Sequence, residues 1–282
     1  MSSQLHIRNH TFDWGAKTYI MGVLNVTPDS FSDGGEFNSV DAAVIQAQEM
    51  VSSGADIIDI GGQSTKPGTE QITLQEELNR VIPVITAIRT VTDKIISVDT
   101  TRSEVAELAI EAGGDIINDI SGGTYDPEIF KVAFSMQAPI ILMHIRGTPA
   151  TMQKLTNYDD VVGEIISFLK GQIEIAVNTG IKRNQIIIDP GIGFAKNYEQ
   201  NLEIFHRLKE LHQLDCPILI GPSRKSFIGR ILNQPDPKGR LMGTAAACSA
   251  AIFQGADIVR VHDVKEIRDV CLVTDALVRN TS

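Results

Sequence analysis

Short apolar runs alternate with longer amphipathic stretches along the chain. About 34 residues separate the ends of successive runs, which is typical of a repeating strand–helix unit rather than of two unlike domains. Runs rich in Ile, Val, Leu and Met predict eight strands buried on both faces, at residues 19–24, 57–58, 95–98, 116–117, 140–143, 186–188, 218–220 and 258–259. The pattern therefore predicts one domain over residues 1–282.

The stretches between these runs carry helix signals. Thr73 with Glu76, and Asp263 with Glu266, have the spacing of N-terminal caps, so helices should begin one residue after each cap. Glycine at positions 54, 113 and 255 suits the left-handed residue that ends a helix before a strand. One buried helix face is predicted from the spacing of Val40, Ala43, Val44, Ala47 and Val51.

Eight such units favour an α/β fold, a (β/α)8 TIM barrel, in which all strands end on one face. The residues before Tyr19 are expected to form a short N-terminal β-hairpin that covers the lower opening of the barrel. A doubly wound open sheet is the alternative. It is disfavoured by the number of units and by residues 191–196, where Lys196 stands in place of the third glycine of a dinucleotide-binding loop.

Composition narrows the class of protein. Hydrophobic residues make up 43% of the chain and charged residues 21%, as in folded globular proteins. The formal net charge of -10 repels phosphate backbones and anionic lipids, so neither nucleic acid nor a membrane is an expected partner. Three cysteines without paired spacing, and no apolar run near the roughly 20 residues that span a bilayer, favour a cytoplasmic location.

Polar side chains follow the apolar runs where the strands end. Asp59, Asp99, Asn118 and Asp189 would meet at the barrel mouth as hydrogen-bond acceptors, which suits a ligand rich in N–H donors such as an aminopyrimidine ring. Each residue taken alone is more simply explained as a turn former or a helix cap. His144 is more typical of a core or rim histidine than of a catalyst.

A basic group follows the last two predicted strands. Arg224, Lys225, Arg260 and His262 indicate an anion site, as phosphate sites commonly lie after strands seven and eight of such barrels. A solvated surface cluster is the alternative interpretation. Two glycine-containing loops, residues 26–35 and 61–69, are predicted to act as lids over the mouth, although ordinary flexible connections contain similar glycines.

Eight of these segments, in order, resemble the motifs of the dihydropteroate synthase family along essentially the whole chain. They are MGVLNVTPDSFSDGG (21–35), DIGGQSTKPG (59–68), SVDT (97–100), INDI (117–120), MH (143–144), DPGIGF (189–194), SRKS (223–226) and RVHD (260–263). The resemblance implies an enzyme that condenses p-aminobenzoate with 6-hydroxymethyl-7,8-dihydropterin diphosphate. The products would be 7,8-dihydropteroate and pyrophosphate, in folate synthesis. It also implies Mg²⁺ as cofactor, small-molecule substrates and a homodimer.

The resemblance also implies roles for single residues. The pterin would be held by Asp99, Asn118, Ile120, Met143, Asp189, Phe194, Gly221, Lys225 and Arg260. The p-aminobenzoate site would comprise Phe31, Thr65, Pro67, Phe194 and Ser226, and the diphosphate site Asn25, Thr65, Arg260 and His262. Asn25 would also bind the metal. The expected catalytic residues are Asn25, Asp59, Asp99, Lys225, Arg260 and His262, with Asp59 or Asp99 stabilising a developing pterin cation.

The chain departs from the commonest family pattern at Gln63, Lys66, Arg102-Ser103, Ile192 and Ala195. Lys66 replaces the usual arginine, and an ammonium cannot reproduce the guanidinium fork, so the strength of p-aminobenzoate or sulfonamide binding stays open. Two other functions share the strand-end acceptors: a pterin-binding methyltransferase module and a non-catalytic pterin sensor. Neither explains Asn25, Arg260 and His262, which would serve the leaving group.

Overall fold

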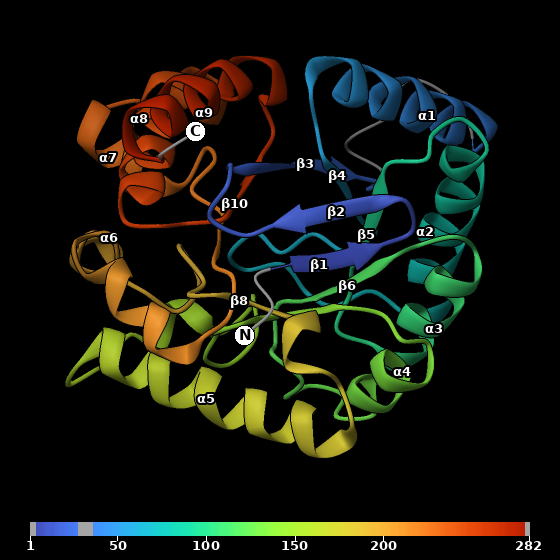
Figure 1. Ribbon diagram of the computed structural model, residues 1–282, viewed down its shortest axis with the longest axis horizontal. Coiled ribbons are helices and arrows are strands. Elements are labelled where there is room, and N and C mark those ends of the chain that lie inside the picture. The colour runs from blue at the N-terminus through green and yellow to red at the C-terminus, as the bar shows by residue number, and fades with distance from the viewer. Residues whose placement is uncertain (1–3, 28–35, 280–282) are drawn as a thin grey trace.

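The computed structural model describes residues 4–27 and 36–279. Its centre is a barrel of parallel strands with helices packed around the outside (Figure 1). The described part of the barrel has eight strands: β3 (Tyr19–Asn25), β4 (Ile57–Gly61), β5 (Ile95–Asp99), β6 (Ile116–Asp119), β7 (Ile140–Met143), β8 (Ile186–Asp189), β9 (Leu219–Ile220) and β10 (Ile258–Val261). All eight predicted strands are confirmed, most of them extended to include the polar residue at the end.

The sheet closes on itself through its shortest strand. The eight strands are hydrogen-bonded side by side in the order β9, β10, β3, β4, β5, β6, β7, β8. Ile218, just before β9, forms a parallel bridge with Ile188 of β8, and the amide of Ile188 donates to the Pro217 carbonyl at 3.0 Å. This contact completes the barrel and confirms the predicted α/β fold class.

The helices follow the strands in alternation: α1 (Glu36–Ser53), α2 (Leu74–Arg89), α3 (Ser103–Glu111), α4 (Ile129–Ser135), α5 (Val161–Thr179), α6 (Tyr198–Arg207), α7 (Ser226–Leu232), α8 (Leu241–Phe253) and α9 (Val264–Val278). Short 3-10 turns occur at η2 (Met152–Lys154), η3 (Arg183–Gln185), η4 (Leu208–Leu214) and η5 (Pro237–Arg240). Within the described residues, no helix is both long and apolar enough to cross a membrane.

One predicted helix cap is confirmed and the other is wrong. Thr73 caps α2, and its hydroxyl accepts from the Glu76 amide at 3.2 Å. Helix α9 does begin at Val264, but the Asp263 side chain makes no cap. Its carboxylate binds the Arg224 guanidinium instead, because a full positive charge on the neighbouring loop competes better for it than a neutral amide does.

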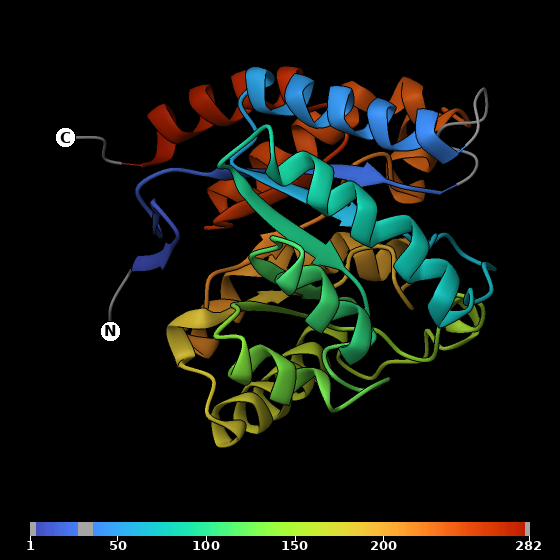
Figure 2. The same cartoon turned by 90° about the vertical axis from the view of Figure 1, so that its right-hand side faces the viewer.

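A two-stranded hairpin, β1 (Gln4–Ile7) and β2 (His10–Asp13), lies across the end of the barrel opposite the strand C-termini (Figures 1 and 2). Its buried side chains join the inward residues of all eight strands in one apolar cluster: Leu5, Ile7, Phe12, Tyr19, Met21, Ile57, Ile95, Ile116, Ile141, Ile187, Leu219 and Ile258. The hairpin therefore covers the lower opening as predicted, and the lower part of the barrel is a packed apolar core.

A second, larger core lies between the barrel wall and the helices. The predicted face of α1 is part of this core, since Ala43 and Ala47 are fully buried and the three valines pack against it. Gly54, Gly113 and Gly255 have φ of 104°, 115° and 92°, so the predicted left-handed helix ends are confirmed. These two cores fix the strands rigidly and hold their polar ends at the mouth.

Candidate active site

Four polar residues from four strands meet in the upper barrel. Arg260 of β10 donates from Nε to Oδ2 of Asp59 on β4, and from Nη2 to Oδ2 of Asp99 on β5, both at 2.6 Å. Asn118 of β6 donates from Nδ2 to both carboxylate oxygens of Asp59, at 3.2 and 3.3 Å. The sequence predicted all four at the mouth, and the structure brings them into direct contact.

The electrostatics of this network follow from its burial. Burial raises the pKa of Asp99, and the nearby Arg260 guanidinium opposes that rise. Burial lowers the pKa of Arg260, but the carboxylates of Asp59 and Asp99 outweigh it and raise the pKa above its ordinary value. The guanidinium is therefore a permanent positive charge held between two strand ends, with about a fifth of its side chain exposed.

Asp189 and Lys225 lie on the opposite side of the mouth. The Asp189 carboxylate ends β8 and accepts from the Gly191 amide at 2.7 Å. Burial raises the pKa of Asp189 to about 6, while Lys225 and Arg260 counteract it. Lys225 precedes α7, and its ammonium lies 4.2 Å from the centre of the Phe194 ring. Burial, followed by repulsion from Arg260, lowers the pKa of Lys225 to about 8.

The wall between these groups is apolar. Ile120, Met143 and Phe194 are buried in a cluster at the mouth together with Ile145, Met152 and Ala195. Gly221 follows β9, and a Cβ there would meet only the Cβ of Arg260, at 3.9 Å. The site thus combines an apolar wall, a flat backbone surface and convergent charged groups, which is the usual makeup of a pocket for a planar polar ring.

His144 is a structural residue, as its sequence context suggested. Its Nδ1 lies 3.0 Å from the ammonium of Lys196, which also donates to the Phe194 carbonyl at 2.8 Å. Both side chains are buried. Burial and the adjacent Lys196 lower the pKa of His144 to about 2, and burial lowers the pKa of Lys196 to about 7. This pair connects the end of β7 to the loop after β8, and the Lys196 ammonium also holds the backbone of Phe194 through its carbonyl.

The predicted basic group is only partly available to an anion. His262 lies after β10 with its Nδ1 3.0 Å from Oγ of Ser223. Arg224 forms an ion pair with Asp263, so its charge is largely neutralised within the protein. Arg260 and Lys225 contact residues of the mouth, and His262 contacts Ser223, whereas Arg224 joins the two loops that follow β9 and β10.

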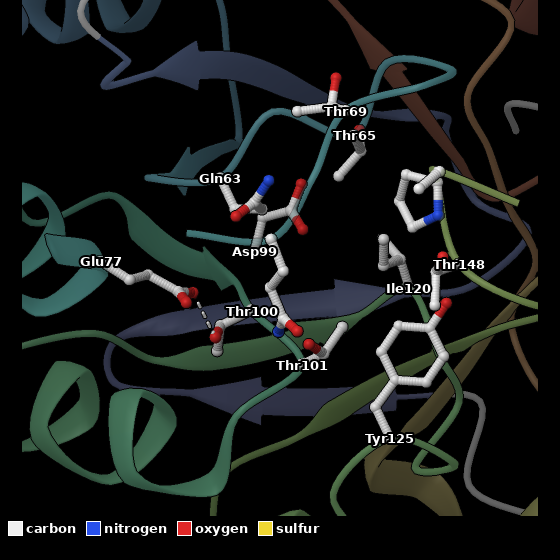
Figure 3. Close-up of a pocket in the computed structure, with 13 residues that line it drawn as sticks. Gln63, Thr65, Thr69, Glu77, Asp99, Thr100, Thr101, Ile120, Tyr125 and Thr148 are labelled. Carbon is white, nitrogen blue, oxygen red and sulfur yellow. Dashed lines mark hydrogen bonds between the residues drawn. The ribbon is translucent and has the colours of Figure 1, made fainter. Parts of the chain in front are cut away.

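A pocket adjoins Asp99 (Figure 3). Asp99 and Ile120 bound it from the barrel, Thr65 from loop 61–69, and Tyr125 from the loop after β6 (Figure 3). Sequence reasoning missed most of its wall, which is formed by Gln63, Thr69, Gln71, Glu77, Thr100, Thr101, Tyr125, Thr148, Pro149 and Ala150. Gln63 and Thr69 belong to the predicted second lid, and Thr100 and Thr101 follow a strand end directly; the other wall residues carried no signal.

Gln63 organises the loop that was predicted to act as the second lid. Its Nε2 donates to the carbonyls of Ser64 and Glu70, at 2.8 and 3.0 Å, and its Oε1 accepts from the Ile72 amide at 2.8 Å. The Gly68 amide donates to the Pro149 carbonyl at 2.9 Å, which links the loop to the far side of the pocket. The loop is thus held in one conformation by its own side chain.

The remaining predicted site residues are more exposed. Thr65 is half-buried, Lys66 and Pro67 are exposed on the same loop, and Ser226 is exposed at the start of α7. Phe31 and most of the first predicted lid lie outside the described residues. Asn25 ends β3, is half-buried, and pairs in register with Gly61.

The structure permits a limited role for Mg²⁺. Among the described residues, no group of three His, Cys, Asp or Glu side chains could hold a metal ion. Mg²⁺ is commonly held by one or two protein oxygens together with water and substrate phosphates. Asn25 fits that arrangement, because it has an amide oxygen and ends β3, the strand next to the one that carries Arg260.

Comparison with known proteins agrees with this geometry. The profile of the pterin binding enzyme family matches residues 21–262. A dihydropteroate synthase from Synechocystis sp. is 60% identical over 268 residues, covering 95% of this chain and 93% of its own. The crystal structure of dihydropteroate synthase from Clostridium difficile, determined in the presence of pteroic acid, has a TM-score of 0.91 and 47% identity, and covers 95% of this chain and 100% of that chain.

A second solved structure adds the other substrate. Dihydropteroate synthase from Xanthomonas albilineans with 4-aminobenzoic acid superimposes with a TM-score of 0.91 and 38% identity, covering 98% of each chain. Similarity of this degree over nearly the whole chain, together with the strand-end acceptors and Arg260, leaves one interpretation. The chain belongs to the dihydropteroate synthase family of pterin-binding transferases.

Proposed function

We propose that this chain condenses p-aminobenzoate with 6-hydroxymethyl-7,8-dihydropterin diphosphate, giving 7,8-dihydropteroate and pyrophosphate, within a single barrel domain. The observation that carries the proposal is the contact of Arg260 with both Asp59 and Asp99 in a buried, polar barrel mouth. A site that must hold a ring with N–H donors and also release an anion needs acceptors and a fixed cation side by side.

The buried acceptors suit the pterin. Its aminopyrimidinone edge carries N–H donors that would bind the carboxylate of Asp189. Asn118 and Asp99 lie at the ends of β6 and β5, which are neighbours in the barrel. The Lys225 ammonium would donate to a ring oxygen or nitrogen. The ring would lie over Gly221 and against Ile120, Met143 and Phe194, with the Arg260 guanidinium at its face.

The more exposed residues suit the second substrate and the leaving group. Thr65, Pro67 and Ser226, with Phe194 and Phe31, would form the p-aminobenzoate site above the pterin. Asn25, Thr65, Arg260 and His262 would contact the diphosphate. The exposure gradient from Asp189 to Ser226 supports this order of depth, since most residues assigned to the pterin are buried, whereas Thr65, Pro67 and Ser226 are not.

The chemistry follows from the charges. The bond between the pterin methylene carbon and the diphosphate oxygen breaks, and its electron pair leaves with the oxygen. The lone pair of the aniline nitrogen then bonds to that carbon, and the nitrogen releases one proton. Asp59 and Asp99 would stabilise positive charge on the pterin, while Arg260 and His262 would bind the departing anion. Their positions are fixed before reaction, so little reorganisation is needed.

A bound Mg²⁺ would supply further positive charge to the diphosphate oxygens. Asn25 would be its one protein ligand among the described residues, with substrate oxygens and water completing the coordination.

We further propose a cytoplasmic homodimer. All three cysteines are buried and free, which suits a reducing compartment. Large apolar side chains are exposed on α8 and α9, where a second copy would cover them: Met242, Phe253, Leu272, Val273 and Leu277. Size-exclusion chromatography with light scattering tests the dimer, and a monomeric mass at micromolar concentration would contradict it.

One assay tests the reaction itself. Pyrophosphate release is measured with pterin diphosphate, Mg²⁺ and p-aminobenzoate together, and then with each omitted. We expect release coupled to formation of dihydropteroate only in the complete mixture. Tight pterin binding without release would instead support a pterin sensor, and methyl transfer to or from a pterin would support the methyltransferase module.

A further inference from the structure

Two consecutive residues after β9 pair with two consecutive residues after the neighbouring strand β10. Oγ of Ser223 lies 3.0 Å from Nδ1 of His262 and accepts from the His262 amide at 3.2 Å. In the next position, Arg224 donates to both carboxylate oxygens of Asp263, with Nε 3.1 Å from Oδ2. The Ser223–His262 contact is thus set by a charged pair directly beside it.

The backbone of Arg224 has an unfavourable conformation, which is held in place by contacts of its side chain and of its peptide groups. Arg224 has a φ of 59°, in the left-handed region, which costs a residue with a Cβ about 1 kcal/mol or more. Its amide donates to Oγ1 of the buried Thr244 at 3.1 Å, and its carbonyl accepts from Arg240 at 2.8 Å. These contacts, with the Asp263 pair, hold the loop in a conformation that glycine would adopt more readily.

The hydrogen-bond donors and acceptors at Ser223 determine the tautomer of His262. A serine hydroxyl has one proton and two lone pairs, and the His262 amide can only donate, so it uses one lone pair of Oγ. Within the part of the chain that the structure describes, Ser223 Oγ has no other hydrogen-bond partner than His262. Its proton is therefore satisfied only by donation to Nδ1, which places the proton of the neutral ring on Nε2.

The ring is neutral for electrostatic reasons. Burial, then the positive charges of Arg224 and Arg260, lower the pKa of His262 to about 3, although Asp263 opposes this. With Nδ1 occupied by Ser223, the one ring nitrogen left for a ligand is Nε2. In the tautomer described above it carries a hydrogen and donates; in the other tautomer it would present a lone pair to an anion.

We propose that Ser223 is a positioning residue that holds His262 in its Nε2–H tautomer, so that the ring donates a hydrogen bond to an oxygen of the diphosphate leaving group. Arg224 and Asp263 keep the two loops in register for this contact. The inference rests on the proposed function for the identity of the anion, but the tautomer itself is a property of the ligand-free protein.

Nitrogen-15 NMR of protein labelled in its histidine rings tests the tautomer without any substrate. The His262→Gln variant identifies the His262 signals among those of the six histidines. We expect the proton on Nε2 in the unmodified protein and a mixture of tautomers in Ser223→Ala. A proton on Nδ1 in the unmodified protein would overturn the proposal, whatever the activity of the enzyme.

Binding and kinetics test the consequence. Ser223→Ala should weaken binding of inorganic pyrophosphate, and raise KM for pterin diphosphate, by about tenfold, the loss expected for one hydrogen bond to a charged group. The KM for p-aminobenzoate should not change, and Ser223→Thr, which keeps the hydroxyl, should restore both values. Unchanged pyrophosphate affinity in Ser223→Ala would overturn the positioning role.

Ser249→Ala is the matched control. It removes a half-buried serine hydroxyl that lies 3.1 Å from Oγ1 of Thr274, between α8 and α9 and away from the mouth. We expect it to leave the His262 spectrum and pyrophosphate affinity unchanged. If the unmodified enzyme releases no pyrophosphate in the complete assay, the proposed function fails, while the NMR result still decides the tautomer.

Discussion

Arg260 and Asp59 are 201 positions apart in sequence, and their side chains share a hydrogen bond of 2.6 Å inside the barrel. Strand β3 lies between the two strands that carry them. The contact places a fixed positive charge and a fully buried carboxylate at the point where the proposed reaction separates a cation from an anion.

The first prediction concerns these carboxylates. Asp59→Asn and Asp99→Asn should each slow the chemical step in single-turnover experiments by about tenfold or more, because each removes negative charge from beside the developing pterin cation. Binding of pterin is measured separately by titration calorimetry. Asp269→Asn, at an exposed carboxylate on α9, is the control and should behave as the unmodified enzyme. Unchanged rates with intact pterin binding would rule out the role in both aspartates.

The second prediction is a pH profile. Asp189 is charged above its pKa of about 6, and Lys225 is charged below its pKa of about 8. If both charges bind the pterin, kcat/KM for pterin diphosphate is highest between these values and falls on either side. Lys225→Arg keeps the positive charge at every pH tested, so the fall above pH 8 should disappear even if overall activity is lower. A fall above pH 8 that persists in this variant would assign it to another group.

The third prediction concerns loop 61–69. Gln63→Glu replaces an amide that donates to two carbonyls with a carboxylate that faces them, so the loop should lose about 1–3 kcal/mol of ordering free energy. Hydrogen exchange at the Ile72 amide should accelerate, and KM for p-aminobenzoate should rise.

Gln75→Glu, an exposed residue on α2 with the same change in charge, controls for simple electrostatics. Equal exchange rates in the unmodified protein and in Gln63→Glu would show that Gln63 does not hold the loop.

The fourth prediction separates stability from activity. Phe12 of the hairpin is 3% exposed and packs against Tyr19 with ring centres 4.7 Å apart. Phe12→Ala should lower the free energy of unfolding in urea by about 3–5 kcal/mol, because it leaves a cavity in the lower core. Activity below the unfolding transition should be retained, since the hairpin is at the far end of the barrel. Phe134→Ala, at a residue 52% exposed, should cost much less; equal losses would contradict the packing argument.

The strands and the strand-end acceptors could be predicted because the barrel repeats one local rule. Most strands are an apolar run with a polar residue at or near the C-terminal end, so the pattern of apolar and polar residues alone locates Asp99 and Asn118. Which side chains form ion pairs or hydrogen bonds with one another could not be predicted in this way. Nothing local to Asp263 indicates that its carboxylate binds Arg224 instead of capping α9, because that choice depends on how two loops meet in space.

The pocket wall shows the same limit. Glu77 is a carboxylate on α2 that looks like an ordinary first-turn residue, yet it is 2% exposed and accepts from the Thr100 hydroxyl at 2.6 Å (Figure 3). Thr148, Pro149 and Ala150 belong to an irregular loop with no periodic signal. Such residues become functional candidates only once the strands have placed their loops side by side.

The hairpin beneath the barrel has a kinetic consequence. The hairpin residues Leu5, Ile7 and Phe12 pack against the inward side chains of all eight strands, so the polar mouth stands on a closed apolar floor and is open on one side. In the proposed arrangement, the pterin ring at Asp189 and Asn118 would enter before a partner that lies among the exposed residues above it. A closed floor far from the reacting atoms would thus favour one order of binding and of release.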